Sequence, residues 1–201
     1  KDISRKLSNL IKEDIPVIQS LSKKYRNNFN KKFLKNYSKY FNFRILGMGG
    51  STLGAQAIYD FLNHKISKNF KFIDNLQVKK EINKKKYTNL IISKSGNTIE
   101  TIVNTNILVK KNDKNIFITE NKNTYLFQLA QKLKSEIIHH NNFIGGRYSV
   151  LSEVGMLPAE LMGLKSTQFR QYNSLINNKN FLNSLIKNVG NTLYLIKKKK
   201  I

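Results

Sequence analysis

The sequence predicts an α/β fold in which a doubly wound, five-stranded parallel sheet carries extra helices at both ends of the chain. Short, continuous apolar runs alternate with longer segments whose apolar residues recur at helical spacing. Such runs are typical of parallel strands that are buried on both faces and joined by right-handed helical crossovers. With 201 residues, 40% of them hydrophobic, the chain is long enough for one substantial core.

Residues 1–40 are expected to form a helical lead-in. Apolar residues recur there at helical spacing from Ile3 to Tyr25. Pro16 is expected to mark the break between two helices, because proline interrupts helical hydrogen bonding. The chain begins at Lys1 rather than Met and stops just after a lysine run, so we expect one or both ends to be incomplete.

The alternating pattern defines a central domain over residues 41–165. Five apolar runs are expected to form its strands: residues 43–46, 70–73, 89–92, 115–118 and 136–139. Amphipathic segments between most of them predict helices: residues 53–62, 99–110 and 124–134. Pro158 is expected in the first turn of a further helix. Residues 166–201 are expected to form a C-terminal helical segment.

The formal charge of +24 is the strongest feature of the composition. Such a field attracts polyanions, so nucleic acid is a partner to consider. However, lysine greatly outnumbers arginine and is scattered through every surface segment. Arginine is the residue favoured for bidentate recognition of bases and phosphates. We therefore favour a lysine-rich surface without a nucleic-acid partner.

Composition also bounds the location and the chemistry. The chain has no cysteine, which excludes disulfides and thiolate metal sites. Its first residues lack the features of a secretory signal, and no stretch approaches the length of a membrane span. We therefore expect a cytoplasmic protein with no membrane partner.

A glycine-rich loop over residues 47–54 lies between the first expected strand and its helix. Glycines at such a turn let the backbone approach a ligand closely, and the helix start with the Ser51 hydroxyl favours an anion. A tight turn without any ligand would explain the same residues. The Walker A lysine is absent and the spacing does not fit the dinucleotide fingerprint, so nucleotide binding is disfavoured.

A second loop over residues 93–101 lies between the third expected strand and its helix. Its hydroxyls, backbone amides and one lysine could surround the oxygens of a phosphomonoester. Alternatively, Asn97 or Thr98 caps the helix. In a doubly wound sheet of order 2-1-3-4-5 the first and third strands are neighbours, so we expect both loops to converge on one anion at their carboxyl ends.

Residues 92–101 resemble the phosphate loop of the sugar-isomerase (SIS) domain family, whose members bind phosphosugars on a flavodoxin-like sheet. Residues 47–54 are similar to the first glycine loop of the glucose-6-phosphate isomerase family. Residues 144–155 resemble the Gly-Gly-Arg-Tyr/Phe-Ser signature of that family. Together the three motifs cover residues 43–164 in the order that the family has.

The resemblance implies a role for each matching residue. The substrate phosphate is held by these residues: Gly50, Ser51, Ser93, Lys94, Ser95, Gly96, Asn97 and Thr98. Arg147 is the implied catalytic residue, since the family's arginine stabilises charge that develops on oxygen as an enediol forms. Alternatively, Arg147 merely pairs with a carboxylate such as Glu153.

The implied reaction converts glucose 6-phosphate to fructose 6-phosphate without a metal or another cofactor, in a homodimer with a shared active site. The family's general base is a glutamate in a Glu-Ser segment that nothing here matches, so we assign no base and expect a missing second SIS domain. His64 is of interest because related stand-alone members complete sites across subunits, although a solvent-facing helix end explains it more simply. A stand-alone phosphosugar-binding regulatory domain is the alternative function.

Overall fold

The computed structural model describes residues 2–76, 85–171, 174–175 and 177–199, which divide into two compact units. The larger unit spans Arg26–Phe169, and the smaller unit combines Lys1–Tyr25 with Arg170–Ile201. The division into residues 1–40, 41–165 and 166–201 stays a prediction. Within the described ranges, no helix combines the length and the apolar character that a membrane span requires.

The larger unit is built on a five-stranded parallel sheet of order β2-β1-β3-β4-β5, which confirms the predicted fold class and strand order. The strands are β1 (Asn42–Leu46), β2 (Asn69–Ile73), β3 (Thr88–Ile92), β4 (Lys114–Thr119) and β5 (Glu136–His139). β1 lies between β2 and β3, with Leu46 opposite Ile73 on one side and Ile91 on the other. Each predicted run therefore forms a strand, within one residue at either end.

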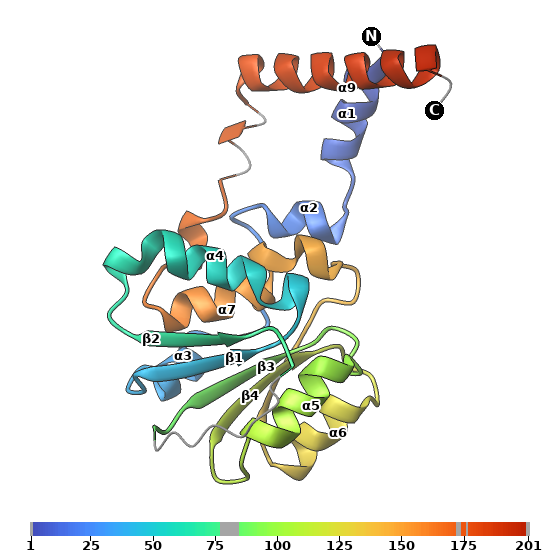
Figure 1. Cartoon of the computed structure of the whole chain (residues 1–201). Coiled ribbons are helices and arrows are strands. Elements are labelled where there is room, and N and C mark those ends of the chain that lie inside the picture. The colour runs from blue at the N-terminus through green and yellow to red at the C-terminus, as the bar shows by residue number, and fades with distance from the viewer. Residues whose placement is uncertain (1, 77–84, 172–173, 176, 200–201) are drawn as a thin grey trace. The chain divides into compact units, whose positions relative to one another are not determined.

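Helices cover both faces of this sheet (Figure 1). The helices of this unit are α3 (Lys31–Tyr37), α4 (Leu53–Leu62), α5 (Ile99–Leu108), α6 (Tyr125–Lys132) and α7 (Glu153–Leu161). Alternate strand residues such as Ile45 and Ile92 pack with α3, α4 and α7. Their neighbours in sequence, such as Leu46 and Ile91, pack with α5 and α6. The period of two in a strand thus divides one apolar run between two cores.

Short 3-10 turns complete the larger unit. They are η1 (Gly49–Ser51), η2 (Asn63–Lys65), η3 (Gly146–Leu151) and η4 (Ser166–Gln168). Two of them lie in segments that the sequence singled out: η1 in the glycine-rich loop over residues 47–54, and η3 in the signature segment over residues 144–155. They are therefore the turns that matter for the site.

The smaller unit contains α1 (Asp2–Lys12), α2 (Pro16–Ser20) and α9 (Lys179–Lys199). Apolar residues of α1, such as Ile3 and Leu7, face a shared hollow with Leu185 and Val189 of α9. The helix α9 lies within residues 166–201, the segment expected to be helical.

Two helix boundaries differ from the predictions. Pro16 opens a helix as expected, but this helix ends at Ser20, and a separate helix begins at Lys31, where the Asn30 side chain accepts a hydrogen bond from the Phe33 amide. Pro158 lies inside α7 rather than in its first turn, because the helix already starts at Glu153. Its missing N–H therefore leaves one carbonyl of that helix without its usual donor.

Candidate functional site

Three loops meet at the carboxyl edge of the sheet. Because β1 and β3 are parallel neighbours, the first glycine loop and the second loop leave the sheet side by side. A Cβ built on Gly47 would lie 2.8 Å from the carbonyl oxygen of Ile92, the last residue of β3. A Cβ on Gly50 would lie 2.2 Å from the carbonyl oxygen of Gly146. The glycines therefore allow direct backbone contact between η1, the end of β3 and η3.

Hydroxyl groups cluster in the loop that follows β3. The Ser93 and Thr98 hydroxyl oxygens lie 3.0 Å apart, and those of Ser95 and Thr98 lie 3.5 Å apart. Gly96 has a φ of +66°, which is a left-handed conformation that favours glycine. A Cβ at this position would also lie 2.0 Å from the Thr124 hydroxyl oxygen. The loop thus folds back on itself and gathers three hydroxyls in one place.

The first turn of α5 has no side-chain cap. Thr98 occupies the N-cap position, but its side chain accepts no hydrogen bond from the helix. Asn97 instead accepts a hydrogen bond from the Tyr125 amide, at 3.2 Å, and so caps the start of α6. The alternative interpretation, in which the side chain of Asn97 or Thr98 caps the helix after β3, is therefore wrong. Uncapped amides at a helix N-terminus are donors suited to an anion.

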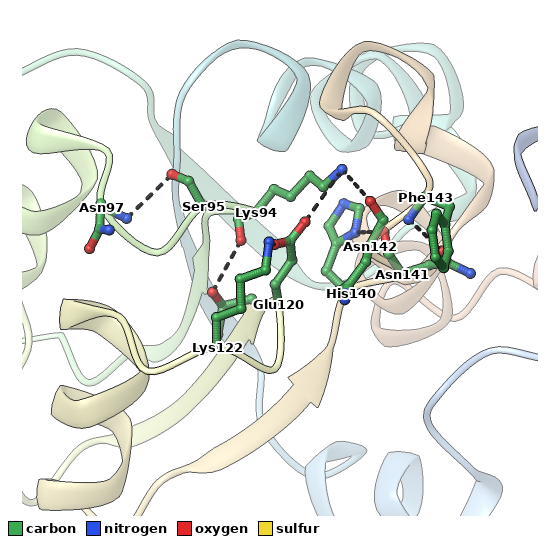
Figure 2. Close-up of polar contacts among 10 residues, drawn as sticks. Lys94, Ser95, Asn97, Glu120, Lys122, His140, Asn141, Asn142 and Phe143 are labelled. Carbon is green, nitrogen blue, oxygen red and sulfur yellow. Dashed lines mark hydrogen bonds and ion pairs between the residues drawn. The ribbon is translucent and has the colours of Figure 1, made fainter.

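The Lys94 side chain extends away from the Ser95 hydroxyl and toward the segment after β5 (Figure 2). Its ammonium group donates a hydrogen bond to the carbonyl oxygen of Asn142 at 2.8 Å and lies 3.4 Å from the Glu120 carboxylate. Lys122 pairs with the same carboxylate at 2.5 Å. Lys94 therefore ties the loop after β3 to the loops after β4 and β5.

Glu120 is the buried centre of this network, with 5% of its surface exposed. Burial alone would raise the pKa of the Glu120 carboxyl. Hydrogen bonds and charge attraction from Lys122 and Lys94 outweigh that effect and hold the pKa below its ordinary value. The carboxylate therefore stays ionised and holds both lysines in place.

His140 is buried beside the same network (Figure 2), whereas His139 is exposed. The His140 Nδ1 donates to the carbonyl oxygen of Asn141 at 2.8 Å. Its Nε2 is buried and has no hydrogen-bond partner among the described residues. Burial lowers the pKa of the His140 imidazole, more strongly than the nearby Glu153 carboxylate raises it. The ring is therefore held neutral.

Arg147 lies in η3 with an exposed side chain. Glu153, the carboxylate considered as its partner, is fully buried and accepts a hydrogen bond from the Asn28 amide at 3.2 Å. Arg147 lines a hollow of about 750 Å³ together with Gly50 and apolar residues of α4 such as Leu53 and Phe61. Arg147 is thus placed beside the first glycine loop.

His64 is not part of this arrangement. It is exposed in η2, one helix length beyond the glycine loop, which for the ten residues of α4 is about 15 Å. Sequence reasoning also missed Glu120 and Asn142, which hold the Lys94 ammonium. Both residues follow strands of the sheet at its carboxyl edge, where ligand sites of such sheets form, and that position was the available signal.

Comparison with known proteins agrees with the motifs. The family described as Phosphoglucose isomerase matches residues 37–197. A glucose-6-phosphate isomerase of Methanocaldococcus jannaschii is 31% identical over 96% of this chain and 52% of its own length. One of Acholeplasma laidlawii is 37% identical over 60% of this chain and 33% of its own length. The chain thus spans about half or less of these relatives.

A solved structure supports the fold. A hypothetical protein from Thermus thermophilus superposes with a TM-score of 0.62 at 21% identity, covering 83% of this chain and 44% of that one. At this identity the likeness concerns the fold alone. The sequence matches carry the assignment, since one family covers most of the chain from the end of α3 into α9. The chain belongs to the phosphoglucose isomerase family.

Proposed function

We propose that this chain supplies the phosphate-binding part of a glucose-6-phosphate isomerase, which interconverts glucose 6-phosphate and fructose 6-phosphate through an enediol. The observation that carries the proposal is the meeting of η1, the loop after β3 and η3 at the carboxyl ends of β1 and β3. Ligands of doubly wound sheets bind at such a point. Membership of an enzyme family favours this function over a regulatory domain without turnover.

The phosphate would be held mainly by hydroxyls and backbone amides. Gly50 and Ser51 would contribute from η1, and Ser93, Ser95 and Thr98 from the loop after β3. Gly96 and Asn97 would shape that loop around the phosphate, since their amides donate to the Ser93 carbonyl oxygen and the Ser95 hydroxyl, each at 3.3 Å. Two features support this arrangement: the clustered hydroxyls and the uncapped first turn of α5. Donors fixed by the fold bind an anion without a further ordering cost.

Lys94 would act differently from the other residues of its loop. Its ammonium is already engaged by Glu120 and Asn142, so its contribution to the phosphate would come from its backbone and its long-range charge. The side chain would hold the loop in place relative to the segment that leads to η3.

Arg147 would stabilise negative charge on the sugar oxygen as the enediol forms. A guanidinium suits this role because it is always charged and its donors sit in a fixed fork. The proton transfer between adjacent carbons also needs a general base, and we assign none in this chain. We further propose that the enzyme works as a homodimer in the cytoplasm, in glycolysis and gluconeogenesis.

Binding of glucose 6-phosphate to this chain tests the phosphate site. Ser95→Ala should weaken binding by roughly tenfold or more, because a hydrogen bond to a charged group contributes about 1.5–3 kcal/mol. Ser67→Ala is the matched control, since Ser67 is exposed and lies ahead of β2. Equal affinities of the two variants, measured by calorimetry, would remove the loop after β3 from the site.

Turnover of the full-length protein tests Arg147. Arg147→Ala should abolish most isomerisation while glucose 6-phosphate still binds. Isomerisation is measured in an assay that couples the formation of fructose 6-phosphate to a spectroscopic signal. Arg147→Lys separates charge from geometry, because lysine keeps the charge and loses the fork. Undiminished turnover of Arg147→Ala would exclude Arg147 from the mechanism.

A further inference from the structure

A second hollow, of about 750 Å³, lies at the amino edge of the sheet, opposite the proposed phosphate site. Its walls come from the segments that precede β1, β3 and β4, including Phe41, Tyr87 and Asn112, together with the end of α5. Because the strands are parallel, their amino ends share one edge. The volume falls in the range of small-molecule sites, which is roughly 300–1,000 Å³.

Almost all charged residues that line the hollow are positive. Its cationic residues are Lys39, Arg44, Lys85, Lys86, Lys110, Lys111 and Lys114. Among the described residues that line it, Asp113 is the one carboxylate. Seven of the sixteen residues that line the hollow are cationic, whereas the whole chain has 36 lysines and arginines in 201 residues. Cations are therefore more concentrated at this hollow than in the chain as a whole.

The single carboxylate is already engaged by the protein. Asp113 accepts a hydrogen bond from the Lys110 amide at 2.9 Å and lies 3.4 Å from the Asn89 side-chain nitrogen. It fixes the turn that presents Lys110 and Lys111 to solvent. Like charges gathered around one hollow repel each other, and a multiply charged anion would relieve that repulsion.

The floor of the hollow is rigid and buried. Arg44 is 5% exposed, its Nε donates to the Asn89 side chain at 2.9 Å, and its Nη2 donates to the Leu108 carbonyl oxygen at 2.7 Å. Its guanidinium also lies 5.1 Å from the centre of the Tyr87 ring. Asn89 in turn donates to the Asn115 side chain at 2.8 Å. Asn115 also donates to the Lys110 carbonyl oxygen at 3.2 Å, so the network fixes the backbone of the turn that carries Lys110 and Lys111. A backbone that is ordered before the ligand arrives lowers the cost of binding.

We propose that this hollow binds a small molecule that carries a chain of linked phosphates, such as tripolyphosphate or a nucleoside triphosphate. A single phosphate would neutralise too few of the cations, whereas a triphosphate brings several charges into one small volume. We favour a small polyphosphate over a nucleic acid because the seven cations line one hollow whose volume suits a small molecule. The site is separate from the proposed phosphate site and does not depend on it.

Calorimetric titration of the whole chain with tripolyphosphate at about 0.15 M salt tests the proposal. We expect saturable binding. The double variant Lys110→Gln/Lys111→Gln should lower the affinity for tripolyphosphate by roughly tenfold or more. The matched control is Lys23→Gln/Lys24→Gln, an exposed adjacent pair that loses the same charge outside the hollow. It should bind within about twofold of the parent chain, because neither lysine lines the hollow and salt screens exposed charges.

Three further arms identify the site and the ligand. Ser95→Ala should leave tripolyphosphate binding unchanged, which separates this hollow from the loop after β3. ATP that binds more tightly than tripolyphosphate would indicate contacts to the base, whereas equal affinities would indicate recognition of the phosphate chain alone. Three results would overturn the proposal. The first is that tripolyphosphate shows no saturable binding, and the second is that both double variants lose the same affinity for it. The third is displacement of tripolyphosphate by a single-stranded oligonucleotide that binds more tightly.

Discussion

Replacing Gly50 by alanine should force the first glycine loop away from η3. An alanine Cβ would lie 2.2 Å from the carbonyl oxygen of Gly146 and 3.0 Å from the amide nitrogen of Arg147, whereas ordinary contact begins at 3.4 Å. The two turns must therefore separate by about 1.2 Å, the difference between 3.4 and 2.2 Å. Both neighbours are backbone atoms, so no side-chain rotation can relieve the overlap.

The expected loss is large enough to measure. Overpacking of this kind costs about 1–3 kcal/mol, and in a chain of this length each kcal/mol lowers Tm by roughly 2–4 °C. Taking the middle of the first range, Gly50→Ala should lower Tm by roughly 4–8 °C. Because Gly50 also lies in the proposed phosphate site, affinity for glucose 6-phosphate should fall as well.

Neighbouring glycines supply matched controls for this prediction. Gly49 has a φ of +52° and open space around its Cβ position, so Gly49→Ala adds backbone strain of about 1–2 kcal/mol without a clash. Gly146→Ala adds neither a clash nor the strain of a positive φ, so it should leave stability nearly unchanged. Thermal unfolding by circular dichroism and calorimetric titration compare the three. If Gly50→Ala unfolds and binds like Gly146→Ala, the contact between η1 and η3 does not exist.

Three further changes test other parts of the larger unit. Leu90→Ala, at a fully buried position of β3, should cost about 2–5 kcal/mol in urea unfolding, and a loss below about 1 kcal/mol would contradict the packing of that strand. Asn97→Ala should cost about 1 kcal/mol because it uncaps α6, and Asn123→Ala, which removes an exposed side-chain hydrogen bond from Gln128, should cost less. Burial lowers the pKa of His140, so its contribution to stability is complete above the ordinary value of 6.5 and is lost as pH falls below it. His140→Phe should flatten the dependence of the unfolding free energy on pH between about 7 and 5, and an unchanged slope would contradict the buried neutral ring.

The central sheet could be predicted because its strands carry an uninterrupted local signal. Leu90, Ile91 and Ile92 are consecutive apolar residues that pack alternately into the two cores. A strand covered on one face only would have alternated with polar residues, so the run itself indicates helices on both faces. Right-handed crossovers then limit the possible strand orders, and the observed order places β1 between β2 and β3.

Features that join distant segments could not be predicted. Asn97 stands two residues before the start of α5, and local rules assign it to the N-terminus of that helix. It caps α6 instead, because the positive φ of Gly96 folds the loop back toward Thr124. Likewise, Lys94 is drawn away from its own loop by Glu120 and Asn142, whose positions are set only when β3, β4 and β5 lie in order.

The two ends of the sheet show why one site was visible in the sequence and the other was not. Each ligand loop at the carboxyl edge is a continuous segment with its own glycines and hydroxyls, so its chemistry can be recognised before the fold is known. The cations at the amino edge come from three separate segments between Lys39 and Lys114 and resemble a general lysine bias in each. They form a concentrated charge only because parallel strands bring their amino ends together, so tertiary structure alone distinguishes this hollow from the rest of a basic surface.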